Sequence, residues 1–172
     1  FNDRALTNIT EPTTINTCFS VCSTDGSCDL VVDDSGPTDN ASDPSQDAAN
    51  VISVYSGAYD NIATNYNPGW GQSGSVNTNY DPGTGNLVMA YTNFNYQGTD
   101  LTGTDASSME YLHVDIWVAA GADRQVKVSP INAGTGAGEV LVEVPMTPGS
   151  WNSVDLPKSA FDGMTWDNLV QM

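Results

Sequence analysis

Residues 111–118 alternate strictly between apolar side chains and polar or aromatic ones. The even positions are Leu112, Val114, Ile116 and Val118, and the odd positions are Tyr111, His113, Asp115 and Trp117. Because successive side chains of a β-strand point to opposite faces, this alternation predicts a strand with its even positions in a core. The odd positions then form a second face that carries the only histidine of the chain.

Several other short runs rich in Val, Ile, Tyr and Trp predict strands, and Gly, Pro, Asn and Asp residues separate them. The predicted strands are 51–55, 76–80, 87–96, 111–118, 125–129, 139–144 and 151–156. No window keeps helical spacing over three turns, so we expect only single turns at 158–161 and 166–169. The pattern indicates an all-β protein, an antiparallel two-sheet β-sandwich.

The chain divides into three parts by composition. Residues 33–48 are rich in Asp, Ser, Pro and Gly with hardly an apolar side chain, which is typical of a solvated linker. Residues 1–32 precede it as a flank or the remnant of a preceding β domain, and residues 49–172 form the predicted β-sandwich domain. The chain starts at Phe1 without a basic, apolar leader, so we expect a mature or trimmed piece of a longer secreted protein.

All three cysteines, Cys18, Cys22 and Cys28, lie in the flank. Their spacing matches no zinc pattern and no histidine is near, so a disulfide between two of them in an oxidising compartment is the better interpretation. The third thiol is then unpaired or bonded outside this sequence.

The charge balance excludes two classes of partner. The chain has 4 Lys and Arg against 21 Asp and Glu, a formal net charge of −17. Nucleic-acid binding requires clustered cations that neutralise phosphates, and attraction to anionic lipid requires them too. No apolar run is long enough for a membrane span, so no membrane insertion is expected.

Two groups of side chains are candidates for ligand contact. On the odd face of 111–118, Tyr111, His113, Asp115 and Trp117 combine aromatic rings with hydrogen-bonding groups; the alternative is that a loop covers this face. Trp70 lies in an Asn-Pro-Gly-Trp-Gly-Gln loop, and Tyr96 and Gln97 precede a glycine. Each of these can equally be a packing residue. Rings beside amides and carboxylates suit a sugar, which has an apolar face and a rim of hydroxyls.

Four blocks carry a resemblance to a known family: "VISVYSGAYDNIATNYNPGWGQ", "YTNFNYQGTDL", "MEYLHVDIWVA" and "GSWNSVDLPKSAF". They resemble a carbohydrate-binding module of secreted polysaccharide-degrading and glycan-binding proteins of marine bacteria, over about residues 50–172. The resemblance implies a jelly roll of galactose-binding-like fold. "FNDRALT" and "INTCFSVCSTDGSC" in residues 1–28 are similar to the closing hairpin of a starch-binding-like sandwich repeat of the same proteins.

The resemblance also implies a structural Ca²⁺ near the first strand, with Asp60 or Asp115 as a ligand. Gly57 stands where the family pattern has an acidic residue, which weakens a metal site in that loop. A secreted or cell-surface location and a partnership with other domains or subunits of a larger assembly follow from the same resemblance.

The sequence favours a binding protein over an enzyme. It contains none of the common motifs for nucleophilic, metal-dependent or nucleotide chemistry, and no paired carboxylate motif of a glycosidase. Two functions remain: a non-catalytic polysaccharide-binding module, for a neutral β-glucan such as laminarin, or a structural or adhesive domain of a large secreted surface protein. Catalytic domains of the parent protein, if present, would be separate from this one.

Overall fold

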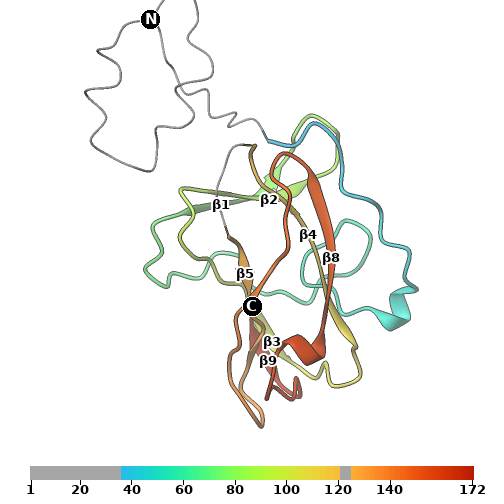
Figure 1. The fold of residues 1–172 in the computed structure, drawn as a ribbon, viewed down its shortest axis with the longest axis vertical. Helices are drawn as coiled ribbons and strands as arrows, with labels where there is room; N and C mark the ends of the chain where they lie inside the picture. The colour runs from blue at the N-terminus through green and yellow to red at the C-terminus, as the bar shows by residue number, and fades with distance from the viewer. Residues whose placement is uncertain (1–35, 121–124) are drawn as a thin grey trace, which may run out of the picture. The chain divides into compact units, whose positions relative to one another are not determined.

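A computed structural model of the chain describes residues 36–120 and 125–172. In these ranges the secondary structure consists of nine strands and two single-turn 3-10 helices, which confirms the all-β class (Figure 1). The elements are η1 (Ala48–Asn50), β1 (Ser75–Tyr80), β2 (Val88–Thr92), β3 (Asp100–Thr104), β4 (Tyr111–Trp117), β5 (Lys127–Val128), β6 (Ile131–Asn132), β7 (Val142–Glu143), β8 (Trp151–Pro157), η2 (Lys158–Ala160) and β9 (Leu169–Gln171).

The strands pair antiparallel in four small sheets within the described ranges. β1 pairs with β2, β4 with β8 and β5 with β7, and the fourth sheet has the order β3-β9-β6. The ladder of β4 and β8 is the longest and runs without a bulge from Tyr111 opposite Pro157 to Trp117 opposite Trp151. These two strands therefore form the most regular part of the fold, side by side in Figure 1.

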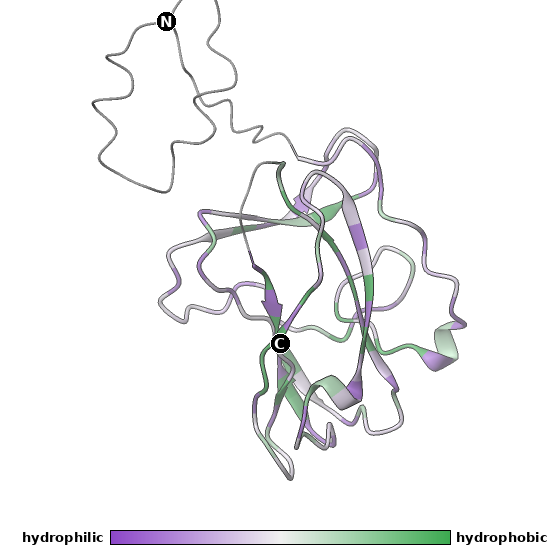
Figure 2. Ribbon diagram, viewed as in Figure 1, coloured by the Kyte–Doolittle hydropathy of each residue, from purple (hydrophilic) through white to green (hydrophobic). Residues whose placement is uncertain are grey.

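β4 has the predicted register. Leu112, Val114 and Ile116 are partly buried and pack against the hydrophobic core, and Val118, directly after the strand, is buried. Two of their partners on β8 follow the same rule: Val154, opposite Val114, packs against the core, and Leu156, opposite Leu112, is a core residue. Bands of alternating hydropathy along β8 are visible in Figure 2.

The core is formed mainly by the second half of the chain. Its buried members are Leu101, Ala106, Val144, Leu156, Phe161, Trp166 and Leu169. The rings of Phe161 and Trp166 meet edge to face with centroids 5.2 Å apart, a favoured geometry for an aromatic pair. Trp166 is thus a packing residue, and η2 at the predicted turn 158–161 places Phe161 beside it.

The predicted strand 51–55 is wrong. Only Ser53 forms a β-bridge, a parallel one with Asn61. The Ser53 hydroxyl donates a hydrogen bond to Asn61 Oδ1 and the Ser53 carbonyl accepts one from the Ile62 amide, so the chain folds back on itself. Ile52 and Val54 pack against the core from this loop, which explains the apolar run.

Other predicted strands are shorter than expected. The strand predicted at 87–96 ends at Thr92, because Asn93 has a φ of 50° and turns the chain. The strands predicted at 125–129 and 139–144 are reduced to β5 and β7, of two residues each. At 166–169 no helical turn forms, since Trp166 has a φ of 64° and Leu169 already begins β9.

Residues 36–47, most of the predicted linker, contain no helix or strand and are largely exposed. Three contacts nevertheless attach them to the rest of the unit Ser35–Met172. Pro37 is buried, Trp151 Nε1 donates to the Asp39 carbonyl at 2.8 Å, and the Tyr59 hydroxyl donates to the Gln46 carbonyl at 2.7 Å. At its end, the Asp47 carboxylate accepts a hydrogen bond from the Ala49 amide and caps η1.

The predictions of a disulfide and of no membrane insertion depend wholly or partly on residues outside the described ranges. Cys18, Cys22 and Cys28 lie outside the described residues, so their disulfide stays a prediction. Among the residues that are described, no helix is long and apolar enough to cross a membrane.

Candidate functional site

The odd positions of β4 form a polar cluster with β8. His113 Nδ1 lies 2.7 Å from Asp155 Oδ1 on β8, and His113 Nε2 lies 3.2 Å from Asp115 Oδ2. Partial burial lowers the pKa of His113, but the hydrogen bonds and charges of Asp155 and Asp115 outweigh it and raise the pKa above its ordinary value. A protonated His113 donates from both ring nitrogens and so bridges the two strands.

His113 and Asp115, which the sequence predicts as ligand contacts, already interact with each other, and His113 also with Asp155. Both His113 nitrogens have carboxylate partners, and Asp115 Oδ1 is shielded without a hydrogen bond in the described part of the chain. Trp117 is half-buried, whereas Tyr111 is 55% exposed. The structure therefore leaves one well-exposed aromatic ring on this face. Sugar binding by the face stays a prediction, and a packing role of Trp117 is the competing one.

A second cluster is built by the loops 65–72 and 93–98. Gln72 Nε2 donates to the Pro68 carbonyl at 2.7 Å and lies 3.3 Å from Gln97 Oε1. Gln97 Nε2 in turn lies 3.1 Å from the Gly98 carbonyl and 3.4 Å from that of Tyr66. The two glutamine amides thus tie the loops together, and Gln97 acts in the structure as a positioning residue.

Trp70 and Tyr96 lie at the surface of this loop cluster. The Tyr96 hydroxyl donates to the Trp70 carbonyl at 2.7 Å. The indole of Trp70 occupies the space that a Cβ would need at Gly98, where it would approach within 1.9 Å of Cζ3, so only glycine permits this contact. Trp70 is 36% exposed and Tyr96 44% exposed. Neither ring is a core residue.

The structure brings Trp70, Tyr96 and Gln97 together but does not join them to the β4 face. No hydrogen bond between the two groups exists among residues 36–120 and 125–172. Phe94, also exposed, extends the aromatic surface of the loops, and its ring centroid lies 5.4 Å from that of Tyr91.

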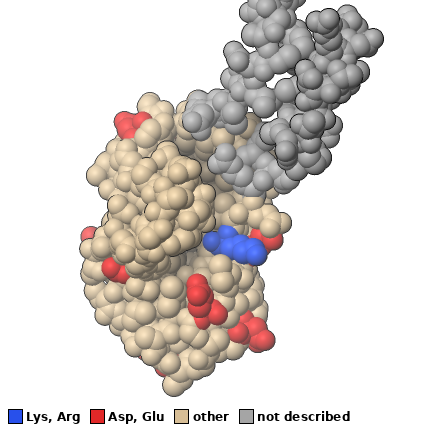
Figure 3. All heavy atoms as spheres, turned by 90° about the vertical axis from the view of Figure 1, so that its left-hand side faces the viewer, with Lys and Arg blue, Asp and Glu red and all other residues tan. Residues whose placement is uncertain are grey.

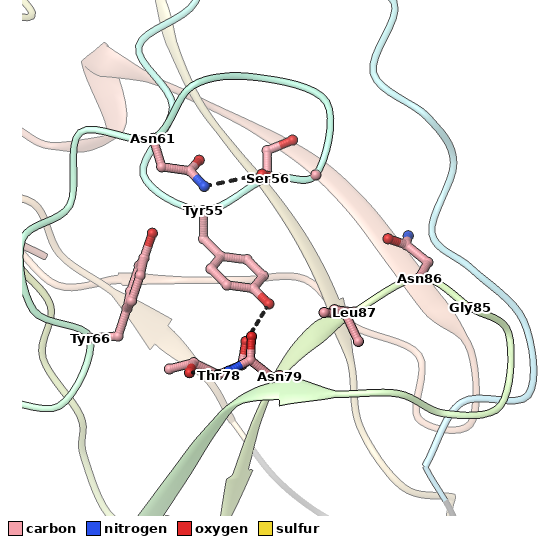
Figure 4. A pocket seen from close by; sticks show the side chains of 10 residues that line it. Tyr55, Ser56, Asn61, Tyr66, Thr78, Asn79, Gly85, Asn86 and Leu87 are labelled. Atoms are coloured by element: carbon pink, nitrogen blue, oxygen red, sulfur yellow. Dashed lines mark hydrogen bonds between the residues drawn. The ribbon is translucent and has the colours of Figure 1, made fainter.

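Next to the loop cluster lies a cavity of about 440 Å³, which is within the range of small-ligand sites. Its walls come from the loop 55–66, β1 and the turn that precedes β2 (Figure 4). The lining residues are Tyr55, Ser56, Gly57, Asn61, Tyr66, Thr78, Asn79, Gly85, Asn86 and Leu87. None of them is charged.

Two tyrosines give the cavity a fixed wall. The rings of Tyr55 and Tyr66 meet edge to face at 88° with centroids 5.4 Å apart. The Tyr55 hydroxyl donates to the Thr78 carbonyl at 2.9 Å, and that of Tyr66 to the Val54 carbonyl at 2.8 Å. Burial raises the pKa of both phenols above the ordinary value, so both are neutral at physiological pH.

The amides of the cavity differ in how they are held. Asn61 is fixed, since its Oδ1 accepts from the Ser53 hydroxyl and its Nδ2 donates to the Ser56 carbonyl at 3.1 Å. The Asn86 side chain makes no hydrogen bond within the described ranges. It faces Gly57, where a Cβ would lie 3.6 Å from Asn86 Oδ1 and otherwise in open space. Asn86 therefore has donors and an acceptor available for a ligand.

The expected calcium site gains no support from the geometry. In the described part of the chain no group of three or more His, Cys, Asp or Glu side chains lies close enough to hold a metal ion. Asp60 is exposed. A Ca²⁺ site at Asp60 or Asp115 stays a prediction.

Sequence reasoning missed the cavity because its residues have no shared pattern. Tyr55 and Tyr66 lie in the stretch predicted as a strand and a long loop, whereas Thr78 and Asn86 lie about 20 residues later. The many Tyr and Asn residues between positions 55 and 86 are a weak sequence signal for a polar, aromatic ligand site. Only the fold of the loop 55–66 over β1 brings these side chains together.

No protein-family model, curated protein or solved structure matches this chain.

Proposed function

We propose that this chain is a non-catalytic module that binds an uncharged polysaccharide. The observation that carries this proposal is the surface formed by the loops 65–72 and 93–98, where exposed aromatic rings stand beside amides that hold them in place. Trp70 and Tyr96 are its central rings, and Gln72 and Gln97 its positioning amides.

The chemistry of such a surface matches that of a sugar chain. The C–H face of a pyranose packs on a flat ring, and its hydroxyls both donate and accept hydrogen bonds, as amides do. Because the loops are already fixed by internal hydrogen bonds, less conformational entropy is lost on binding. The preferred ligand is therefore an extended glycan, which can contact several rings at once.

The charge distribution favours a neutral glycan over a sulfated or uronate polymer. A net charge of −17 repels polyanions. Figure 3 shows one face of the molecule, the side of the β1–β2 hairpin, on which few charged side chains interrupt a broad uncharged surface. A neutral β-glucan such as laminarin fits this surface.

The proposal includes the finer architecture and setting implied by the resemblance. The four sheets would belong to the two layers of a jelly roll with a galactose-binding-like fold, in a secreted or cell-surface protein with further domains. A structural Ca²⁺ at Asp60 belongs to the same proposal.

The experiment is a calorimetric titration of laminarin into the intact chain and into Trp70→Ala. Removal of one stacking indole should weaken binding about tenfold, or about 1.4 kcal/mol. Folding should be preserved because Tyr96 bonds to the backbone carbonyl of residue 70. Leu141→Ala is the matched control, since Leu141 is an exposed apolar side chain, 61% accessible, on a different element.

Equal loss of affinity in both variants, or none in Trp70→Ala, would contradict the role of the loops. Absence of binding to laminarin and to every other glycan tested would favour the alternative, a structural or adhesive domain whose exposed rings contact neighbouring domains.

A further inference from the structure

We infer that the cavity beside Tyr55 receives one neutral, unmodified hexose ring of the polysaccharide. This inference rests on the proposed function and deepens it, because it assigns a sugar subsite to a cavity that adjoins the surface of Trp70 and Tyr96. It also specifies which glycans the site rejects.

The cavity has a suitable volume and a rigid aromatic wall. Its volume of about 440 Å³ exceeds that of a water cluster and lies in the lower part of the range for small-ligand sites. Tyr66 contacts the Tyr55 ring at 88° and both hydroxyls are bonded to backbone carbonyls. The aromatic wall is therefore already in place before a ligand arrives, as preorganised sites require.

The cavity also contains hydrogen-bonding groups that the protein itself does not use. Each tyrosine hydroxyl donates its proton to a carbonyl and keeps acceptor capacity for a sugar hydroxyl. Asn86 keeps its donors and its acceptor, and in Figure 4 it lies on the opposite side of Tyr55 from Tyr66. A ring that packs beside Tyr55 would have hydrogen-bond partners of both kinds within one cavity.

The lining of the cavity carries no charged side chain. Ten residues form the cavity and none is Lys, Arg, His, Asp or Glu. A sulfate ester or a uronate carboxylate placed there would lose part of its hydration without a cation to compensate, which is unfavourable. The cavity thus selects unsubstituted hexoses.

Gly57 provides a direct test, because it leaves the space open. No positive φ constrains Gly57, and the nearest atom to a Cβ built there is Asn86 Oδ1 at 3.6 Å. Gly57→Phe should fill the cavity with a benzyl group at little cost to folding. Gly138→Phe is the matched control, since Gly138 lies outside the cavity lining, has no positive φ, and a Cβ there would meet only the Asn132 carbonyl oxygen, at 3.5 Å.

The titrations use the intact chain, with laminarin as the neutral probe and alginate as the uronate probe. We expect Gly57→Phe to weaken laminarin binding at least about tenfold, Gly138→Phe to change it less than about twofold, and alginate not to bind. Asn86→Ala is the second variant, for which we expect a loss of about fivefold to tenfold with an unchanged thermal unfolding midpoint.

The outcomes separate this inference from the proposed function. Laminarin binding that is unchanged in folded Gly57→Phe, or in Asn86→Ala if the first variant does not fold, overturns the cavity as a subsite and leaves the loop surface standing. Alginate binding that Gly57→Phe abolishes overturns the selection for neutral rings. A wild-type chain that binds no neutral glycan overturns both proposals.

Discussion

His113 links the two strands of one ribbon through both of its ring nitrogens, and this arrangement makes its contribution to stability pH-dependent. Its pKa is raised in the folded state by Asp155 and Asp115, against the opposing effect of burial. A group with a raised folded pKa stabilises fully below its unfolded pKa, about 6.5, and loses this stabilisation as the pH rises through the folded value.

The free energy of unfolding of the wild type should therefore fall, relative to His113→Gln, as the pH rises above about 6.5. The His113 side chain is 47% exposed, so solvent screening limits the difference to less than about 1 kcal/mol. Chemical denaturation of both proteins at several pH values measures it. A difference that does not vary with pH would show that the bridge does not depend on the imidazolium.

Asp167 shows how an acidic residue of this chain is used for structure. Its carboxylate accepts hydrogen bonds from Thr165, Asn132 and Thr135, and these lower its pKa well below the ordinary value. A Cβ at Gly134 would lie 2.0 Å from Asp167 Oδ1. The loop can approach the carboxylate this closely only because residue 134 is glycine.

At the scale of elements, the packing between β4 and β8 limits how much of the odd face of β4 is accessible to a ligand. Trp117 pairs directly with Trp151, whose indole Nε1 is bonded to the segment 36–47. The half-buried Trp117 is thus part of a packed ribbon end. Because of this packing, Trp117→Ala should lower the thermal unfolding midpoint by several degrees, for a loss of about 1–2 kcal/mol, and leave laminarin affinity within about twofold.

Scanning calorimetry and a laminarin titration of the same Trp117→Ala sample test this prediction. Tyr111→Ala serves as the control on the same strand, since Tyr111 is exposed and opposite Pro157. A tenfold loss of affinity with an unchanged midpoint would instead establish the odd face of β4 as a ligand surface.

Elements also differ in how far the sequence predicts them. β4 was predictable because its strict alternation fixes both the strand and its register. The apolar run 51–55 has no alternation that separates a strand from a packed loop, and a single bridge from Ser53 to Asn61 forms there. β3 and β9 were missed because they are short and depend on one another, 65 or more residues apart along the chain.

At the scale of the whole molecule, the net charge of −17 gives a clear expectation for ionic strength. Binding of a neutral glycan involves no charge on the ligand and no charged lining in the cavity. Its affinity should change less than about twofold between about 0.02 and 0.5 M salt, since screening acts on charge pairs. The same affinity should hold from about pH 5 to pH 9, because burial keeps Tyr55 and Tyr66 neutral there.

Calorimetric titrations of laminarin across these conditions test the expectation. Affinity that rises steeply with salt would indicate that the ligand carries negative charge and that screening relieves its repulsion. Affinity that changes near neutral pH would point to His113, the only histidine, and hence to the β4 face.

The sequence by itself determined the all-β class, the register of β4 and the position of the η2 turn, because these follow from the local pattern of apolar, polar and turn residues. Only the tertiary structure decided which candidate residues meet. It grouped Trp70, Tyr96 and Gln97, engaged His113 with Asp155 from another strand, and formed the cavity of Tyr55 and Asn86. Such contacts depend on how loops fold back over strands, and no local periodicity encodes that path.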